Sequence, residues 1–167
     1  MEMQFFVRPG SEMEWYAHWK QARMDFHKAI GLPADKLRFH DHDKFAHYAK
    51  AAVDIEYEFP FGWKELEGVH ARGNYDLTQH STHSGEDLTY LDPQTNERYL
   101  PHIVESSVGV GRTMLMVLSD AYTVEQTEGG ERTVLKLNKR LAPVKAAVFP
   151  LLRNKPELVA KAREVFD

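Results

Sequence analysis

PHIVESSVGVGRTMLMVLSDAY, residues 101–122, is the stretch that decides the fold. Its first half is rich in β-branched residues and favours a buried strand. Gly109 and Gly111 follow, and glycines there allow the backbone to turn sharply and to approach a ligand closely. Apolar residues then recur at helical spacing, which predicts a largely buried helix with Arg112 at its start. A guanidinium held on such a helix matches the oxygen geometry of a phosphate group.

Composition narrows the class of protein. The chain has 167 residues, of which 43% are hydrophobic and 28% charged, as in an ordinary folded domain or one domain plus part of another. It has no cysteine, so disulfides and thiolate metal sites are excluded. A formal net charge of −4 argues against an autonomous nucleic-acid-binding module. Neither a basic leader nor a membrane-spanning apolar run is present, so we expect a cytoplasmic protein that does not contact membranes.

The N-terminal third predicts a strand followed by a helix. Residues 1–8 form a strand that Pro9-Gly10 ends, and apolar residues at helical spacing predict a helix over 12–30. A short strand is expected at 37–39 and a helical turn within 43–50.

The middle of the chain predicts an antiparallel pair. Residues 53–59 alternate apolar and charged side chains, FPFGW breaks the strand, and 65–72 alternates again. Asn74 or Asp76 is expected to cap a short helix. The polar segment 84–98 is expected to be a hairpin or a surface excursion.

The last part of the chain changes character. Residues 123–140 are polar and contain glycine, which predicts a linker. LAPVKAAVFPLL, residues 141–152, predicts a strand, and Pro156 starts a helical pattern with an apolar stripe that continues to Phe166.

Two segments carry a resemblance to a known family. DIEYEFPFGWKELEGVHARGNYDLTQHS, residues 54–81, and the opening stretch 101–122 resemble the catalytic domain of homodimeric glycyl-tRNA synthetases, which are class II aminoacyl-tRNA synthetases. MEMQFFV resembles the second strand of that family's motif 2, and 101–122 resembles motif 3. LAPVKAAVFPLL resembles the first strand of the C-terminal anticodon-binding domain.

The resemblance implies an α+β fold with a mostly antiparallel sheet flanked by helices. Residues 1–122 would be a partial class II catalytic domain that lacks motif 1 and the first half of motif 2. Residues 123–140 would be the linker, and 141–167 the truncated start of an α/β anticodon-binding domain, its first β-α unit. The chain is therefore expected to be a fragment of a longer enzyme.

The activity implied by the resemblance is that of a glycine–tRNA ligase. Glycine and ATP, with Mg²⁺, would form glycyl-adenylate, and the glycyl group would pass to tRNA(Gly) on a homodimeric parent enzyme. The isolated chain is expected to be inactive, since half of the ATP site would be missing. The alternative is a synthetase-like accessory or tRNA-binding protein that has kept the fold and lost the chemistry.

The resemblance also implies the residues that bind glycine. Glu2, Glu105 and Ser107 match its glycine pocket, where carboxylates would hold the ammonium group. Arg72 matches an arginine that faces the glycine carboxylate or the α-phosphate. From the residues alone, Glu105 could be an ordinary strand-end carboxylate, and Arg72 could form a cross-strand ion pair.

ATP binding is implied for a second set of residues. Arg112 matches the motif 3 arginine near the γ-phosphate, with Gly109 and Gly111 before it, although a structural salt bridge is the alternative. Alternation places Glu65 and Glu67 on one face of a strand, where they either help bind ATP or are simply solvated. Mg²⁺ would be held through ATP, by Glu65 or Glu105.

The nine histidines do not predict a metal site. Those in the pairs at 40–42 and 80–83 fall in polar loops or helix ends, without a third ligand cluster. We expect them to be solvated.

Overall fold

The computed structural model describes residues 1–42 and 49–167. The helical turn expected within 43–50 falls mainly on residues 43–48, outside the described part. The chain divides into two compact units, Met1–Lys136 and Leu137–Asp167.

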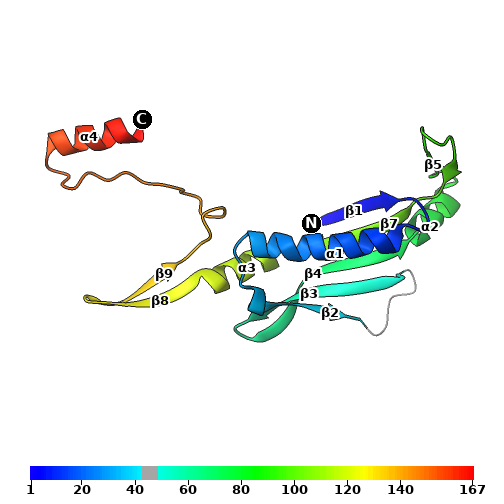
Figure 1. The fold of residues 1–167 in the computed structure, drawn as a ribbon, viewed down its shortest axis with the longest axis horizontal. Coiled ribbons are helices and arrows are strands. Elements are labelled where there is room, and N and C mark those ends of the chain that lie inside the picture. Colours follow the sequence, from blue (N-terminus) through cyan, green and yellow to red (C-terminus); the bar gives the residue numbers. More distant parts are fainter. Residues whose placement is uncertain (43–48) are drawn as a thin grey trace. The chain divides into compact units, whose positions relative to one another are not determined.

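The first unit is built on a five-stranded antiparallel sheet with the order β1-β7-β4-β3-β2 (Figure 1). Its strands are β1 (Glu2–Val7), β2 (Leu37–Asp41), β3 (Ala51–Phe59), β4 (Gly62–Gly73) and β7 (His102–Val108). The α+β class predicted from the sequence is confirmed.

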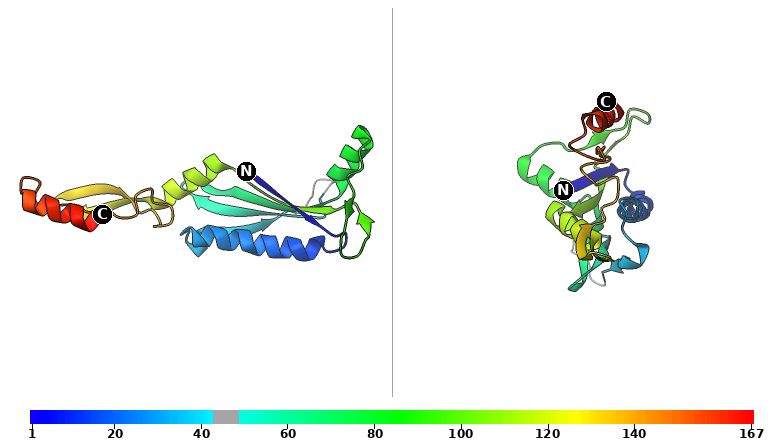
Figure 2. Two further views of the ribbon diagram at one scale, coloured as in Figure 1. Left: turned by 90° about the horizontal axis from the view of Figure 1, so that it is seen from above. Right: turned by 90° about the vertical axis from the view of Figure 1, so that its left-hand side faces the viewer.

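Helix α1 (Glu12–Ala29) runs along one face of this sheet (Figure 2), and the one-turn helix η1 (Ala34–Lys36) leads into β2. Apolar side chains that alternate along β3 point to the same face as α1, because burial removes them from water. The core between them contains Met24, Leu32, Leu37, Ile55, Tyr57, Phe59, Leu66 and Met116 in one cluster and Tyr16, Val53, Val69, Ala71 and Val104 in another.

An irregularity in β4 changes which way its side chains point. Ile55 pairs with Glu67, but Glu56 pairs with Glu65, so Leu66 is an extra residue in β4. Opposed residues on paired strands point to the same side of a sheet. Glu65 and Glu67 therefore lie on opposite faces, and the prediction that they share a face is wrong.

The segment after β4 forms α2 (Tyr75–Ser84), which Gly85 ends in the left-handed conformation at φ 76°. Asn74 is the residue before the helix, but its side chain makes no capping hydrogen bond. Asp76 is not a cap either, because its carboxylate binds Arg72. The expected hairpin is confirmed, as β5 (Tyr90–Leu91) pairs with β6 (Arg98–Tyr99).

Helix α3 (Val110–Ala121) follows β7, as the junction sequence predicts. It is not largely buried, however. Met116 and Ala121 are buried, whereas Met114 is 63% exposed and Leu115 47% exposed. The apolar spacing correctly predicted the helix, but burial of that stripe also requires an element packed over it.

The predicted linker at 123–140 is in large part a hairpin of β8 (Tyr122–Thr127) and β9 (Gly130–Leu135). Glu125 bonds Arg132 across it. Polar composition suggested a connection, yet cross-strand pairs of opposite charge also stabilise an exposed hairpin.

The second unit contains α4 (Pro156–Phe166), with the proline in the first turn as predicted. The strand expected at 141–152 is absent from the structure. A strand requires a neighbour for its backbone groups, and no strand lies among the described residues of this unit. The assignment of 141–167 to a separate domain type stays a prediction.

Of the helices in residues 1–42 and 49–167, none has the length and apolar character needed to cross a bilayer.

Candidate functional site

The candidate site lies on the face of the sheet opposite α1. Three strands contribute to it at the same level, because Gln4 of β1 pairs with Glu105 of β7, which in turn pairs with His70 of β4. Their side chains therefore project together from one face.

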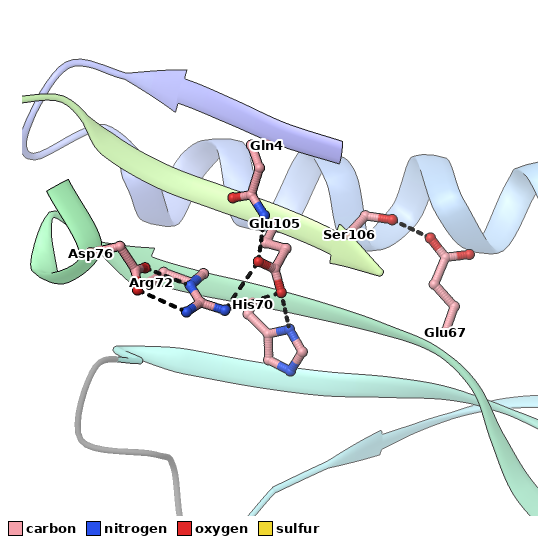
Figure 3. Close-up of polar contacts among 7 residues, drawn as sticks. All are labelled: Gln4, Glu67, His70, Arg72, Asp76, Glu105 and Ser106. Carbon is pink, nitrogen blue, oxygen red and sulfur yellow. Dashed lines mark hydrogen bonds and ion pairs between the residues drawn. The ribbon is translucent and has the colours of Figure 1, made fainter. Parts of the chain in front are cut away.

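Glu105 is the centre of this group (Figure 3). Arg72 Nη1 donates to its two carboxylate oxygens at 3.0 and 3.2 Å. Gln4 Nε2 donates to Oε2 at 2.5 Å, and His70 Nδ1 lies 3.6 Å from Oε1. Glu105 is only 7% exposed, so its charge is balanced by these neighbours rather than by bulk water.

Arg72 is held from its other side by Asp76. Arg72 Nε and Nη2 donate to the two Asp76 oxygens at 2.8 and 3.0 Å. This bidentate contact, together with the charge of Glu105, raises the pKa of Arg72, and Arg72 in turn lowers the pKa of Asp76. The guanidinium is thus fixed between two carboxylates.

The cluster borders a hollow of about 350 Å³. The hollow is lined by Glu2, Gln4, Phe6, Arg72, Asp76, Leu77, His80, Ile103 and Glu105. It combines acidic, basic and apolar side chains, as a site for a small zwitterion requires.

Glu2 lines this hollow, and Ser107 is its cross-strand partner. Glu2 is part of β1, where it pairs with Ser107, and Ser107 also pairs with Gly68 of β4. The structure therefore brings Glu2, Arg72 and Glu105 together around one hollow, with Ser107 on the same face.

A second hollow, of about 300 Å³, contains Arg112. Its lining residues are Phe59, Phe61, Lys64, Glu65, Arg112 and Leu115. Arg112 Nη1 donates to the main-chain oxygen of Glu65 at 2.9 Å and lies 3.4 Å from its carboxylate. Arg112 forms no buried salt bridge, since its side chain is 47% exposed.

Gly109 and Gly111 do not form the sharp turn predicted for them. Gly109 has φ −79° and ψ 120°, an ordinary extended conformation, and Gly111 already belongs to α3. A Cβ on Gly111 would meet no atom within 4 Å, so open space lies beside this turn of the helix.

Glu67 does not reach either hollow. Its side chain is fully buried on the α1 side, where it contacts Arg23, His27 and Ser106. The prediction that Glu67 contributes to the ATP site therefore loses its geometric basis.

Three members of the site were missed from the sequence: Gln4, His70 and Asp76. The first two could have been found only with the strand register, which places them opposite Glu105. Asp76 was noticed as a helix cap, although its spacing of four residues from Arg72 also suited an ion pair.

No metal site is preformed in the described residues, because these contain no group of three or more histidine or acidic side chains placed to hold an ion.

No family model matches the chain. Curated relatives nevertheless match almost all of it. It is 52% identical over 163 residues to the glycine–tRNA ligase of Caldanaerobacter subterraneus subsp. tengcongensis, covering 96% of this chain and 35% of the relative. It is 50% identical over 170 residues to the glycine–tRNA ligase of Clostridium tetani, covering 100% of this chain and 36% of the relative. The chain thus spans about a third of the length of these relatives.

Solved structures share the fold at low sequence identity. Seryl-tRNA synthetase from Pyrococcus horikoshii complexed with ATP has a TM-score of 0.59 and 14% identity, over 73% of this chain and 26% of that one. Cytoplasmic serine–tRNA ligase from Naegleria fowleri in complex with AMP has a TM-score of 0.58 and 17% identity, over 73% and 28%. The five-stranded sheet thus resembles the catalytic core of class II synthetases.

Proposed function

The chain is a homologue of glycine–tRNA ligases over its whole length, and we propose that it forms the glycine- and ATP-binding wall of such an enzyme. The observation that carries this proposal is the Arg72–Glu105 pair at the edge of a hollow. Two fixed and opposite charges in contact match the two charges of an amino acid.

The reaction has two steps. A carboxylate oxygen of glycine attacks the α-phosphorus of ATP, and the bond to the β-phosphate breaks, which gives glycyl-adenylate and pyrophosphate. A terminal hydroxyl of tRNA(Gly) then takes the glycyl group and releases AMP. Both steps depend on orienting the reactants and stabilising negative charge, for which this face supplies fixed charged groups.

Glycine would enter by dividing the Arg72–Glu105 pair. Its ammonium would be held by Glu105, with Glu2 as the second carboxylate, because an unpaired cation in a closed site is costly. Its carboxylate would face Arg72, which Asp76 keeps oriented; in the alternative pose Arg72 faces the α-phosphate. Ser107 would contribute its hydroxyl to the same pocket.

ATP would occupy the second hollow. Arg112 would bind the γ-phosphate side, and the first turn of α3 with Gly109 and Gly111 would lie beside the phosphates, at the helix end that favours anions. Phe61 offers a flat ring for the adenine base, since it is 62% exposed and stacks on Phe59 at 5.0 Å.

Mg²⁺ fits better at Glu65 than at Glu105. Mg²⁺ bound with ATP takes one or two carboxylates and keeps waters and phosphate oxygens as its other ligands. The Glu65 carboxylate is half exposed beside the second hollow, whereas both oxygens of Glu105 accept hydrogen bonds from Arg72. When bound, the ion would neutralise phosphate charge.

We propose that residues 141–167 begin an anticodon-binding domain, and that the enzyme is a cytoplasmic homodimer. Since the relatives are about three times longer than the matched region, we expect catalysis to need regions of those relatives that this chain does not cover.

Binding of a stable glycyl-adenylate analogue to the 167-residue chain tests the proposal. We expect titration calorimetry with glycylsulfamoyl adenosine to show binding that Glu105→Gln weakens by tenfold or more, roughly the value of a hydrogen bond to a charged group. Glu125→Gln is the matched control, because Glu125 also pairs with basic side chains but lies on the β8–β9 hairpin. Equal binding by wild type and Glu105→Gln would contradict the proposal.

Activity assays separate the alternative functions. We expect little ATP–pyrophosphate exchange with glycine from the 167-residue chain; exchange at the rate of full-length glycine–tRNA ligases would contradict this. A chain that binds tRNA but not the analogue would instead favour the accessory role.

A further inference from the structure

A buried polar network lies on the α1 side of the sheet, on the face opposite the hollow that Glu105 lines. Its centre is Glu67, whose side chain is 0% exposed. Arg23 Nε donates to Oε1 at 2.5 Å and Nη2 to Oε2 at 3.2 Å, while His27 Nε2 lies 2.7 Å from Oε2. Ser106 donates its hydroxyl hydrogen to Oε1.

Glu67 is kept charged by these partners. Burial acts to raise its pKa, but hydrogen bonds from His27, Arg23 and Ser106 outweigh that effect and lower the pKa. A buried carboxylate that is fully paired stays in one place, because leaving any partner costs free energy.

The network is joined to the glycine site through β7. Ser106 stands between Glu105 and Ser107 in sequence, and alternation sends its side chain to the opposite face. Ser106 pairs with Val69 of β4, in the same stretch where Glu105 pairs with His70 and Ser107 with Gly68. Figure 3 shows the Ser106–Glu67 contact on the strand that carries Glu105.

We propose that Glu67 and Ser106 are positioning residues for glycine: they clamp β7 onto β4 and α1, so that Glu105 stays in contact with Arg72. This inference rests on the proposed function of the hollow. A binding group must be held within about 0.5 Å of its productive place. On the open face Glu105 is held by Arg72 and Gln4, and glycine would replace its contact with Arg72. The clamp acts from the face that substrate never reaches.

The ATP hollow provides an internal comparison. Arg112 is anchored by the main-chain oxygen of Glu65, which precedes the extra residue Leu66 in β4. Loss of the Ser106–Glu67 hydrogen bond therefore lets Glu105 shift but leaves the Arg112–Glu65 hydrogen bond unchanged. A purely structural role would instead weaken both hollows together, or neither.

Ser106→Ala is the main test, because it removes one hydrogen bond while Glu67 keeps Arg23 and His27. The matched control is Leu37→Val, which removes one methylene group from a buried residue of β2, a strand that adjoins neither β4 nor β7. Affinities for glycylsulfamoyl adenosine and for ATP alone are measured by calorimetry on the 167-residue chain, with the melting temperature of each variant.

We expect Ser106→Ala to weaken the analogue about tenfold, the typical effect of losing a hydrogen bond to a charged group, and to leave ATP affinity within about twofold. Leu37→Val should lower the melting temperature without separating the two affinities. Glu67→Gln should give the same separation as Ser106→Ala, more strongly if it folds. Unchanged analogue binding in Ser106→Ala, or an equal loss for both ligands, would overturn the proposal.

A crystal structure of Ser106→Ala distinguishes failure of this inference from failure of the proposed function. If wild type binds neither ligand, the glycine and ATP roles fail, but the clamp is still tested by the Arg72–Glu105 distance, 3.0 Å in the intact network. A longer distance in the variant supports the clamp. An unchanged distance refutes it.

Discussion

The two faces of the sheet use the same chemistry for different ends. Each carries a carboxylate held by an arginine and a histidine: Glu67 with Arg23 and His27 under α1, and Glu105 with Arg72 and His70 on the open face. Only Glu105 borders a hollow. We infer from this difference that access, and not the set of residues, separates a structural ion pair from the proposed binding site.

The strongest test of this contrast is Glu67→Gln. It leaves the partly buried Arg23 without its counter-charge, so we expect a loss of about 3–5 kcal/mol in the free energy of unfolding, as for other broken buried pairs. Urea denaturation measures it. Glu125→Gln should cost less than about 1 kcal/mol, because its pairs lie on an exposed hairpin. Equal losses would remove the distinction between the two settings.

The free energy of unfolding should depend on pH through Glu12, a second carboxylate buried at α1. Burial would raise its pKa, but hydrogen bonds from Lys50, His102 and the Gly10 N–H lower it from 4.5 to about 2. Because the folded-state pKa is depressed, its contribution is complete above pH 4.5 and is lost as the pH falls toward 2.

We expect this loss to be on the order of 3 kcal/mol, measured as the urea midpoint between pH 5 and pH 2. Glu12→Gln should be less stable at pH 7, and its urea midpoint should fall less between pH 5 and pH 2 than that of wild type. If the urea midpoint of Glu12→Gln fell as much as that of wild type, the pH dependence would belong to other carboxylates.

On the open face, Glu105→Gln should cost stability far less than it costs binding. Arg72 keeps Asp76 as a partner, so we expect a loss of about 1 kcal/mol in unfolding free energy. Chemical denaturation of the variant, beside its affinity for the glycyl-adenylate analogue, measures both effects. A loss as large as that of Glu67→Gln would mean that Glu105 is mainly structural.

The smallest effect on folding is expected for Phe61→Ala. The ring is 62% exposed, so unfolding free energy should change by less than about 1 kcal/mol. ATP affinity should fall severalfold, because the stacking surface is lost, whereas glycine affinity should stay the same. Calorimetry with each ligand measures both affinities. The control is Tyr90→Ala, which removes an exposed ring from β5.

The elements of the fold followed from local pattern. Alternation located β3 and β4, and helical spacing located α1, α3 and α4, because these periods depend on neighbouring residues alone. Which elements pack against one another could not be predicted from that pattern. The exposed stripe of α3 and the missing strand at 141–152 both depend on what packs against a segment, which periodicity does not contain.

The candidate site, too, could be predicted only in part. The family resemblance pointed to Glu2, Arg72 and Glu105, which lie around one hollow. Glu67 was misplaced because strict alternation was assumed through Leu66. Nothing in the letters KELEG signals an extra residue, since a bulge arises from how two strands pair and twist.

The extra residue at Leu66 also gives β4 two phases. Before it, the odd-numbered Glu65 faces the open side; after it, the even-numbered Gly68, His70 and Arg72 do. Deleting Leu66 would remove this change of phase, because the residues before it would shift by one position and turn to the other face. Either Glu65 or Arg72 would then leave the open face, so β4 presents a residue to each hollow only because Leu66 is inserted between them.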